Sequence, residues 1–357
     1  MCSSDLPFSS EGLDIPWNLR RIRADAAWRE EHVAGKGVVV ALCDSGLMVA
    51  PPLLQALWKN PGEKLNGQDD DGNGYVDDLF GYDFAVRSFY ALGDSGPISH
   101  GSICAGIIAG RPEPKSLIIT GVAPRALLMV LRGMGYLKSY EYALANGADV
   151  MSMSYMWPGV ELGHYRGLFR TAHEHLAAGG LVAVGGAGNF SRLPQGKQIA
   201  LPKDIPCVIA AAGILEDGSK APPSSEGPCY WNGVKFYDDF PPEAALQKPD
   251  VTGCFGGYPM WYRVTGALRV PKAKVAVLEG TAFALVVGPQ GNSFSGPHAA
   301  GVAALMLSAN PEMNAWEVKS LMEQTCQDIG PKGRDLTFGA GLLNALEAVR
   351  AAKKTHK

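Results

Sequence analysis

The chain has 357 residues, 46% of them hydrophobic and 19% charged, which is close to the average of globular proteins and is compatible with a large buried core. Its formal net charge of −3 carries no basic excess, so neither nucleic acid nor an anionic membrane surface is expected as a main partner. No run of residues approaches the ~18 consecutive apolar positions of a membrane-spanning helix.

Short apolar runs alternate with helical patterns along most of the chain. Strands are predicted at residues 37–44, 126–131, 149–154, 181–188 and 208–213, and helices at residues 100–110, 140–148, 166–178, 293–308, 314–325 and 344–352. The strand runs are continuously apolar instead of alternating, which is typical of strands covered on both faces. We therefore predict an α/β fold with a doubly wound, mostly parallel central sheet flanked by helices.

Two segments lie outside this regular alternation. Residues 219–290 are rich in proline, glycine and aromatic residues, and we expect loops and short strands of the same domain there. Residues 1–14 show neither the basic segment nor the apolar core of a secretory signal, and we treat them as an N-terminal extension. Because the chain contains no internal repeat, residues 15–357 are predicted to form a single domain.

Polar residues suited to acyl transfer occur where predicted strands end and predicted helices begin. Asp44, Ser154 and Asn189 fall at or just after the carboxyl ends of strands, where the functional groups of parallel sheets gather. His100 and Ser293 each begin an apolar helix, and a nucleophile at a helix start gains from free backbone N–H groups. Taken singly, Asp44 suits a turn, His100 suits a buried core histidine and Ser293 suits an N-cap. Together they supply the hydroxyl, base and orienting acid that serine acyl transfer needs.

The segments around these residues resemble the signature blocks of the subtilase family. The similar blocks are DSG at 44–46, HGSICAG at 100–106, VGGAGN at 184–189 and GNSFSGPHAAG at 291–301. Their order in the chain is also the order of that family, and it differs from the order in α/β-hydrolases and chymotrypsin. The resemblance extends from about residue 15 to residue 349 and implies a subtilisin-like fold and a serine endopeptidase.

The resemblance also implies a role for each catalytic residue. Ser293 would attack the peptide carbonyl, His100 would take and return the proton, and Asp44 would orient the imidazole. The side-chain amide of Asn189 and the backbone N–H of Ser293 would stabilise the oxyanion. Cys104 matches a cysteine that some branches of the family carry beneath the catalytic histidine, although plain core packing explains it as well.

The predicted substrate wall departs from the family pattern. Ser154-Tyr155-Met156-Trp157 stands where many subtilases have Ser-Leu-Gly-Gly, in a strand that pairs with the substrate backbone. Two alternatives follow: Met156 and Trp157 narrow or reshape the primary pocket, or the loop is re-registered so that they lie elsewhere. The other pocket residues implied by the resemblance carry no charge, and they are Gly186, Ala187, Gly188 and Ala200. We therefore predict an apolar or aromatic substrate residue before the scissile bond.

An acidic loop, QDDDGNGYVDD, occupies residues 68–78. Its alternating oxygen-bearing residues suit a calcium ion, and the candidate ligands are Asp69, Asp71, Asn73, Tyr75 and Asp77. Carboxylates packed this densely repel one another without a cation. The alternative is a solvated acidic turn, because Phe80 stands where an EF-hand would have its bidentate glutamate.

The seven cysteines are scattered and show no C-x-x-C spacing, so neither a zinc site nor a dense disulfide framework is indicated. A bridge between Cys229 and Cys254 is one alternative, and two free thiols are the other.

Two functions other than peptide hydrolysis stay open at this point. A transamidase or macrocyclase would resolve the acyl-enzyme with an amine, and an inactive domain would keep the calcium-stabilised fold for binding. We expect a protein or peptide substrate and a monomer. The family resemblance further implies a secreted enzyme that is made with a propeptide.

Overall fold

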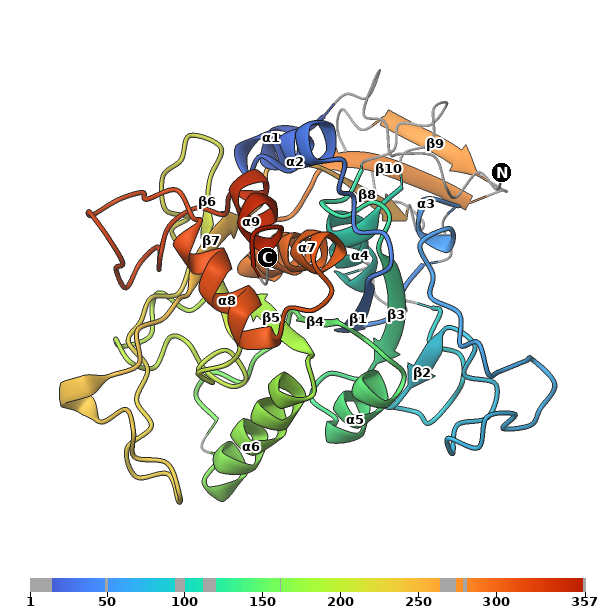
Figure 1. The fold of residues 1–357 in the computed structure, drawn as a ribbon, viewed down its shortest axis with the longest axis horizontal. Coiled ribbons are helices and arrows are strands. Elements are labelled where there is room, and N and C mark those ends of the chain that lie inside the picture. Colours follow the sequence, from blue (N-terminus) through green and yellow to red (C-terminus); the bar gives the residue numbers. More distant parts are fainter. Residues whose placement is uncertain are drawn as a thin grey trace.

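The computed structural model describes residues 15–48, 51–93, 100–111, 120–160, 162–263, 274–278 and 281–355 (Figure 1). Its centre is a seven-stranded sheet in the order β2-β3-β1-β4-β5-β6-β7, in which neighbouring strands are parallel. These strands are β1 (Val39–Asp44), β2 (Gly81–Asp83), β3 (Leu127–Arg132), β4 (Val150–Met153), β5 (Val182–Gly186), β6 (Ile209–Ile214) and β7 (Val251–Cys254). The predicted α/β fold with a parallel central sheet is confirmed.

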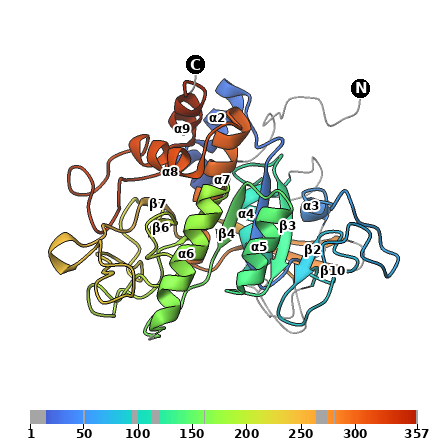
Figure 2. The same ribbon diagram turned by 60° about the horizontal axis from the view of Figure 1, so that its bottom comes forward.

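Helices cover both faces of this sheet (Figures 1 and 2). On one face, α7 (Asn292–Ala309) packs across β4 to β7, and α4 (His100–Ala109) packs against α7 and β1. On the other face, α5 (Leu137–Ala145) and α6 (His164–Ala178) pack against each other. The remaining helices are α1 (Trp17–Arg21), α2 (Ala24–Glu31), α3 (Pro51–Leu54), α8 (Ala315–Gln324) and α9 (Ala345–Ala352).

A close approach between α7 and the sheet determines where the first turn of that helix lies. A β-carbon on Gly296 would lie 2.5 Å from the backbone nitrogen of Gly186, so only glycine lets the helix backbone reach β5. Gly186 is equally restricted, because its β-carbon would lie 1.9 Å from the carbonyl oxygen of Asn292. The start of α7 is therefore held directly against the end of β5.

The region 219–290 contains loops and short strands, as predicted. It contributes β7 and a separate three-stranded antiparallel sheet in the order β8-β10-β9. The strands of this second sheet are β8 (Pro259–Arg263), β9 (Lys274–Leu278) and β10 (Thr281–Val287). The elements β2, α1 and α2 were not predicted, since each is too short to show a clear hydrophobic period.

The cysteines of the described residues are free, and the bridge considered between Cys229 and Cys254 is not formed. The sulfur of Cys229 lies 3.8 Å from the carbonyl oxygen of Ile199, and that of Cys254 lies 3.7 Å from the carbonyl oxygen of Asn18. Both are buried core residues. Residues 1–14, predicted as an extension, lie outside the described residues, and no described helix is long and apolar enough to cross a membrane.

Candidate active site

Asp44 and His100 form a close pair at the end of the central strand. Asp44 is the last residue of β1, His100 is the first residue of α4, and 2.7 Å separates Asp44 Oδ1 from His100 Nδ1. A β-carbon on Gly101 would lie 2.1 Å from the carbonyl oxygen of Gly46, so glycine lets α4 begin directly against the turn after β1. Asp44 is only 1% exposed, and the same Oδ1 accepts the backbone N–H of Ser45.

This pairing favours a protonated imidazole. Burial of His100 works against the positive charge, but the neighbouring Cys104 and the carboxylate of Asp44 together outweigh it, and the pKa of His100 lies above its usual value. A base whose protonated form is stabilised in place is what proton transfer from a hydroxyl requires.

Ser293 lies in the first turn of α7 and contacts the segment that follows β4. The Ser154 hydroxyl donates to the Ser293 carbonyl at 2.8 Å, and the Ser293 hydroxyl donates to the Ser154 carbonyl at 3.4 Å. The second bond is long, so it holds the Ser293 hydroxyl only weakly. The ring of Phe294 lies 5.6 Å from the ring of His100, measured between centroids.

Cys104 lies beneath these groups and joins them. Its sulfur is 3.9 Å from His100 Nδ1 and 3.5 Å from both the Ser154 hydroxyl and the Ser293 carbonyl. The thiol is buried, and burial raises its pKa, so it is protonated and packs as a small apolar group. Cys104 thus contacts both His100, which pairs with Asp44, and the backbone of Ser293.

Two hydrogen-bond donors face a common space beside Ser293. The side-chain oxygen of Asn189 accepts the backbone N–H of Asn292 at 2.8 Å, which fixes the direction of its amide. The position that a β-carbon on Gly291 would take lies 3.4 Å from Asn189 Nδ2 and 3.8 Å from the backbone nitrogen of Ser293. The amide nitrogen of Asn189 and the backbone nitrogen of Ser293 therefore lie near the same point beside Gly291.

A pocket of about 120 Å³ opens next to Ser293. It is lined by Ser154, Tyr155, Met156, Gly186, Gly188, Asn189, Phe190 and Ser293, none of which is charged. The sulfur of Met156 lies only 2.5 Å from the position of a β-carbon on Gly188, so the methionine packs directly on the glycine backbone. Met156 is thus one of the residues that form the wall of this pocket.

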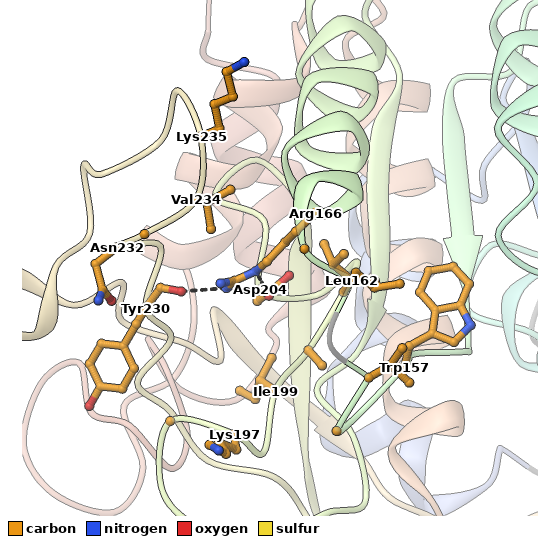
Figure 3. Close-up of a pocket in the computed structure, with 17 residues that line it drawn as sticks. Trp157, Leu162, Arg166, Lys197, Ile199, Asp204, Tyr230, Asn232, Val234 and Lys235 are labelled. Carbon is orange, nitrogen blue, oxygen red and sulfur yellow. Dashed lines mark hydrogen bonds and ion pairs between the residues drawn. The ribbon is translucent and has the colours of Figure 1, made fainter.

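Three of the predicted pocket residues lie elsewhere. Ala187 is buried in a small cluster with Ile199. Trp157 and Ala200 line a second pocket of about 480 Å³ (Figure 3). The Trp157 ring packs 5.3 Å from the ring of Phe169, and it occupies the space left open by Gly135. The glycine pattern of the family gave no sign that Trp157 would turn away from Ser293.

The second pocket has a charged wall. Arg166 pairs with Asp204 at 2.9 Å and donates to the Tyr230 carbonyl at 2.6 Å (Figure 3). Its guanidinium also lies 4.1 Å from the ring centroid of Trp231. All three contacts keep the guanidinium in place, so it is not free to receive a ligand in this conformation.

The acidic loop gathers carboxylates that differ from the predicted ligand set. Glu63, Asp71 and Asp78 bring one oxygen each to within 4.8 Å of one another. Asp69 accepts backbone N–H groups of the loop itself, including that of Gly74 at 2.8 Å. Asp77 likewise accepts the backbone N–H groups of residues 66 and 67. Of the predicted ligands, only Asp71 belongs to this group.

The other two predicted ligands support the loop. The Asn73 amide donates to Asp71 and Asp78, and the Tyr75 ring lies 5.1 Å from that of Tyr142. Sequence reasoning missed Glu63 because it precedes the acidic run by several residues. It missed Asp78 because the alternate spacing pointed to its neighbour Asp77.

Glu63 gives this group an unusual electrostatic character. It is 5% exposed, and its Oε2 has no hydrogen-bond partner among the described residues. Burial raises the pKa of Glu63, and the carboxylate of Asp78 raises it further. A cation with oxygen ligands would relieve both effects, so these residues fit a calcium ion.

Comparisons with known proteins agree with this geometry. The model of the subtilase family matches residues 35–341. The chain is 28% identical over 335 residues to a Deinococcus radiodurans protein named "Probable subtilase-type serine protease", covering 90% of this chain and 41% of that protein. It is 28% identical over 289 residues to the "Calcium-dependent protease" of Trichormus variabilis, covering 71% of this chain and 40% of that protein.

A solved structure shares the fold. Fervidolysin from Fervidobacterium pennivorans, described as a keratinolytic enzyme related to subtilisin, aligns with a TM-score of 0.64 at 23% identity. The alignment covers 94% of this chain and 45% of fervidolysin. The chain therefore spans less than half the length of each of these three proteins.

Proposed function

Because this chain belongs to the subtilase family, a family of serine peptidases, we propose that it is a serine endopeptidase that hydrolyses peptide bonds through an acyl-enzyme intermediate. The observation that carries the proposal is the His100–Asp44 pair at 2.7 Å, set beside a serine at the start of α7.

The first chemical step moves one proton and forms one bond. Ser293 Oγ attacks the peptide carbonyl carbon while His100 Nε2 takes the hydroxyl proton. Asp44 accepts the Nδ1–H of His100, which keeps Nε2 free as the base and stabilises the imidazolium. The imidazolium then gives its proton to the leaving amine as the peptide C–N bond breaks. Water next attacks the acyl carbon while His100 takes a proton from it, and His100 returns that proton to Ser293 Oγ as the acyl group leaves.

The developing oxyanion lies between two donors. This placement is supported by the positions of the Asn189 amide nitrogen and the Ser293 backbone nitrogen, which both lie near Gly291. Such fixed donors stabilise the transition state without reorganisation.

The uncharged pocket next to Ser293 receives the substrate side chain before the scissile bond. Its volume of about 120 Å³, limited by Met156, suits an apolar side chain. The absence of charge in its lining disfavours arginine and lysine, because a buried cation needs a partner.

A calcium ion would be held by Glu63, Asp71 and Asp78, whose carboxylates supply the hard oxygen ligands that it prefers. It would neutralise the charges of these three residues and tie the acidic loop together, and it takes no part in the peptide chemistry. The name of the Trichormus variabilis relative, "Calcium-dependent protease", supports this proposal. Secretion, a propeptide and a monomeric state are proposed on the family resemblance alone.

The proposal is tested by peptide hydrolysis and covalent labelling of the wild type and of Ser293→Ala. We expect the wild type to cleave casein and to react with a fluorophosphonate, and Ser293→Ala to do neither. A folded wild type that does not react with the label would instead support an inactive binding domain. A product joined to an added amine, seen by mass spectrometry in place of the hydrolysed peptide, would support a transamidase.

A further inference from the structure

Lys203 is a buried lysine that the catalytic steps above do not use. It is 0% exposed and lies in the loop before β6, where its backbone N–H donates to the Ala200 carbonyl at 2.8 Å. Its alkyl chain runs along β5, and a β-carbon on Gly185 would lie 2.0 Å from Lys203 Cε. Glycine at position 185 therefore makes the space that the lysine fills.

The amine of Lys203 binds the segment that follows β4. It donates to the Tyr155 carbonyl, which is its hydrogen-bond partner within the described residues, and it lies 5.0 Å from the centroid of the Tyr155 ring. Asp204, the next residue in the chain, pairs with Arg166 instead. A primary amine can donate two or three hydrogen bonds, so a single carbonyl leaves this group poorly satisfied.

A buried amine with so few hydrogen bonds lowers the free energy of unfolding. Burial lowers the pKa of Lys203 to about 7, although the nearby acidic groups of Cys43, Asp204 and Asp44 act in the opposite direction. The buried His173 of α6 also interacts with this amine, and its own pKa is lowered by burial. An apolar side chain of similar length would fill the same space without this cost.

The bound carbonyl belongs to the segment that contacts the nucleophile. Ser154, one residue before Tyr155, exchanges two hydrogen bonds with Ser293. Two residues after Tyr155, the backbone N–H of Trp157 donates to the Leu201 carbonyl at 3.1 Å. The loop of Leu201 and Lys203 thus forms hydrogen bonds with the segment 154–157 at two points, the Tyr155 carbonyl and the Trp157 backbone N–H.

We propose that Lys203 is a positioning residue of the peptidase. Its amine donates a hydrogen bond to the Tyr155 carbonyl and so fixes the position of the segment 154–157, against which an extended peptide substrate binds. This inference rests on the proposed function. The lysine touches neither the substrate nor the reacting atoms, and it acts through the backbone of Tyr155.

The test compares two substrates in the wild type and in Lys203→Met, which has a similar length and no donor. An extended tetrapeptide anilide uses the whole segment, whereas a single-residue ester uses only the pocket and the catalytic groups. We expect kcat/KM for the tetrapeptide to fall about 10- to 100-fold and that for the ester to fall less than about threefold. A loss of folding alone would lower both values equally, because it removes active enzyme.

Lys248→Met is the matched control. Lys248 is also 0% exposed, but it binds the Val208 carbonyl and Asp250, away from Ser293. The ratio of the two kcat/KM values should stay at the wild-type value in this control. If Lys203→Met does not fold, Lys203→Gln, which is shorter and uncharged, serves as the variant.

The outcomes separate the two proposals. A wild type that hydrolyses neither substrate contradicts the peptidase itself. A wild type that hydrolyses both, together with a Lys203 variant whose ratio is unchanged, overturns only the positioning role.

Discussion

Replacing Lys203 by methionine is expected to change how the stability of the fold depends on pH. Burial lowers the pKa of this lysine from 10.5 to about 7. Between these two values the unfolded chain binds a proton that the folded chain does not bind, so the stability of the wild type falls as the pH drops from 10.5 towards 7. Methionine binds no proton, and this contribution to the slope is absent in the variant.

The magnitude follows from the shift. Each pKa unit corresponds to 1.36 kcal/mol, so the full shift represents on the order of 5 kcal/mol. Over the accessible range from pH 9.5 to pH 7, the free energy of unfolding of Lys203→Met should rise by roughly 3 kcal/mol relative to the wild type. This corresponds to a relative gain of about 5 °C in Tm.

The measurement is a series of thermal unfolding curves in the Ser293→Ala background, which prevents self-digestion. Circular dichroism would give Tm for both proteins at each pH. Lys197→Met is the control, because Lys197 is exposed and its replacement should shift Tm equally at every pH. Curves for Lys203→Met and the parent that run parallel from pH 9.5 to 7 would refute the reasoning. If Lys203→Met is more stable in this series and has a lower kcat/KM for the tetrapeptide in the active enzyme, the lysine is retained for activity at a cost in stability.

Further predictions concern the catalytic groups, the pocket and the acidic loop. Although burial opposes it, the Asp44 carboxylate raises the pKa of His100, which acts as a base only when neutral, so kcat should be lost as the pH falls through a value above 6.5. Asp44→Asn should lower that midpoint and reduce kcat about 10⁴-fold, and an unchanged midpoint in the pH–rate profile would argue against the pairing. Asn189→Ala removes one proposed oxyanion donor and should reduce kcat by about 10²–10³-fold, the range measured in subtilisin for such a loss; a normal kcat would mean that the oxyanion lies elsewhere. Met156→Ala should raise kcat/KM for phenylalanine before the scissile bond about tenfold relative to alanine in a peptide series, and an unchanged preference would show that the methionine does not limit the pocket. A chelator should lower Tm of the wild type by roughly 5 °C and that of Glu63→Gln by much less, whereas equal shifts would move the cation away from Glu63.

The sequence predicted the central sheet because its strands are buried on both faces and their apolar runs are continuous. It also predicted which polar residues meet, since the carboxyl ends of parallel strands lie at one edge of the sheet. Asp44 and Asn189 illustrate this, because Asp44 ends β1 and Asn189 comes shortly after β5, so that neither needs long-range information to be placed there.

Other features depend on contacts that no local pattern carries. The side chain of Trp157 turns towards Gly135, which is distant in sequence and offers the space of a missing side chain. Glu63 joins the acidic group from outside the acidic run. Lys203 lies under β5 because of Gly185, and a lysine between two apolar segments gives no sign in the sequence that it is fully buried.

Two tyrosines of α5 connect the acidic loop with the substrate side of the molecule. The hydroxyl of Tyr142 donates to Asp78 at 2.5 Å, and that of Tyr140 lies 2.6 Å from the hydroxyl of Tyr155. Helix α5 is thus anchored both to Asp78 of the carboxylate group and to Tyr155, the residue whose carbonyl accepts the hydrogen bond from Lys203. If the group of Glu63, Asp71 and Asp78 binds calcium as proposed, release of the ion and loss of turnover on warming should occur as one cooperative event, and the ambient calcium concentration would then set the highest temperature at which the enzyme can work.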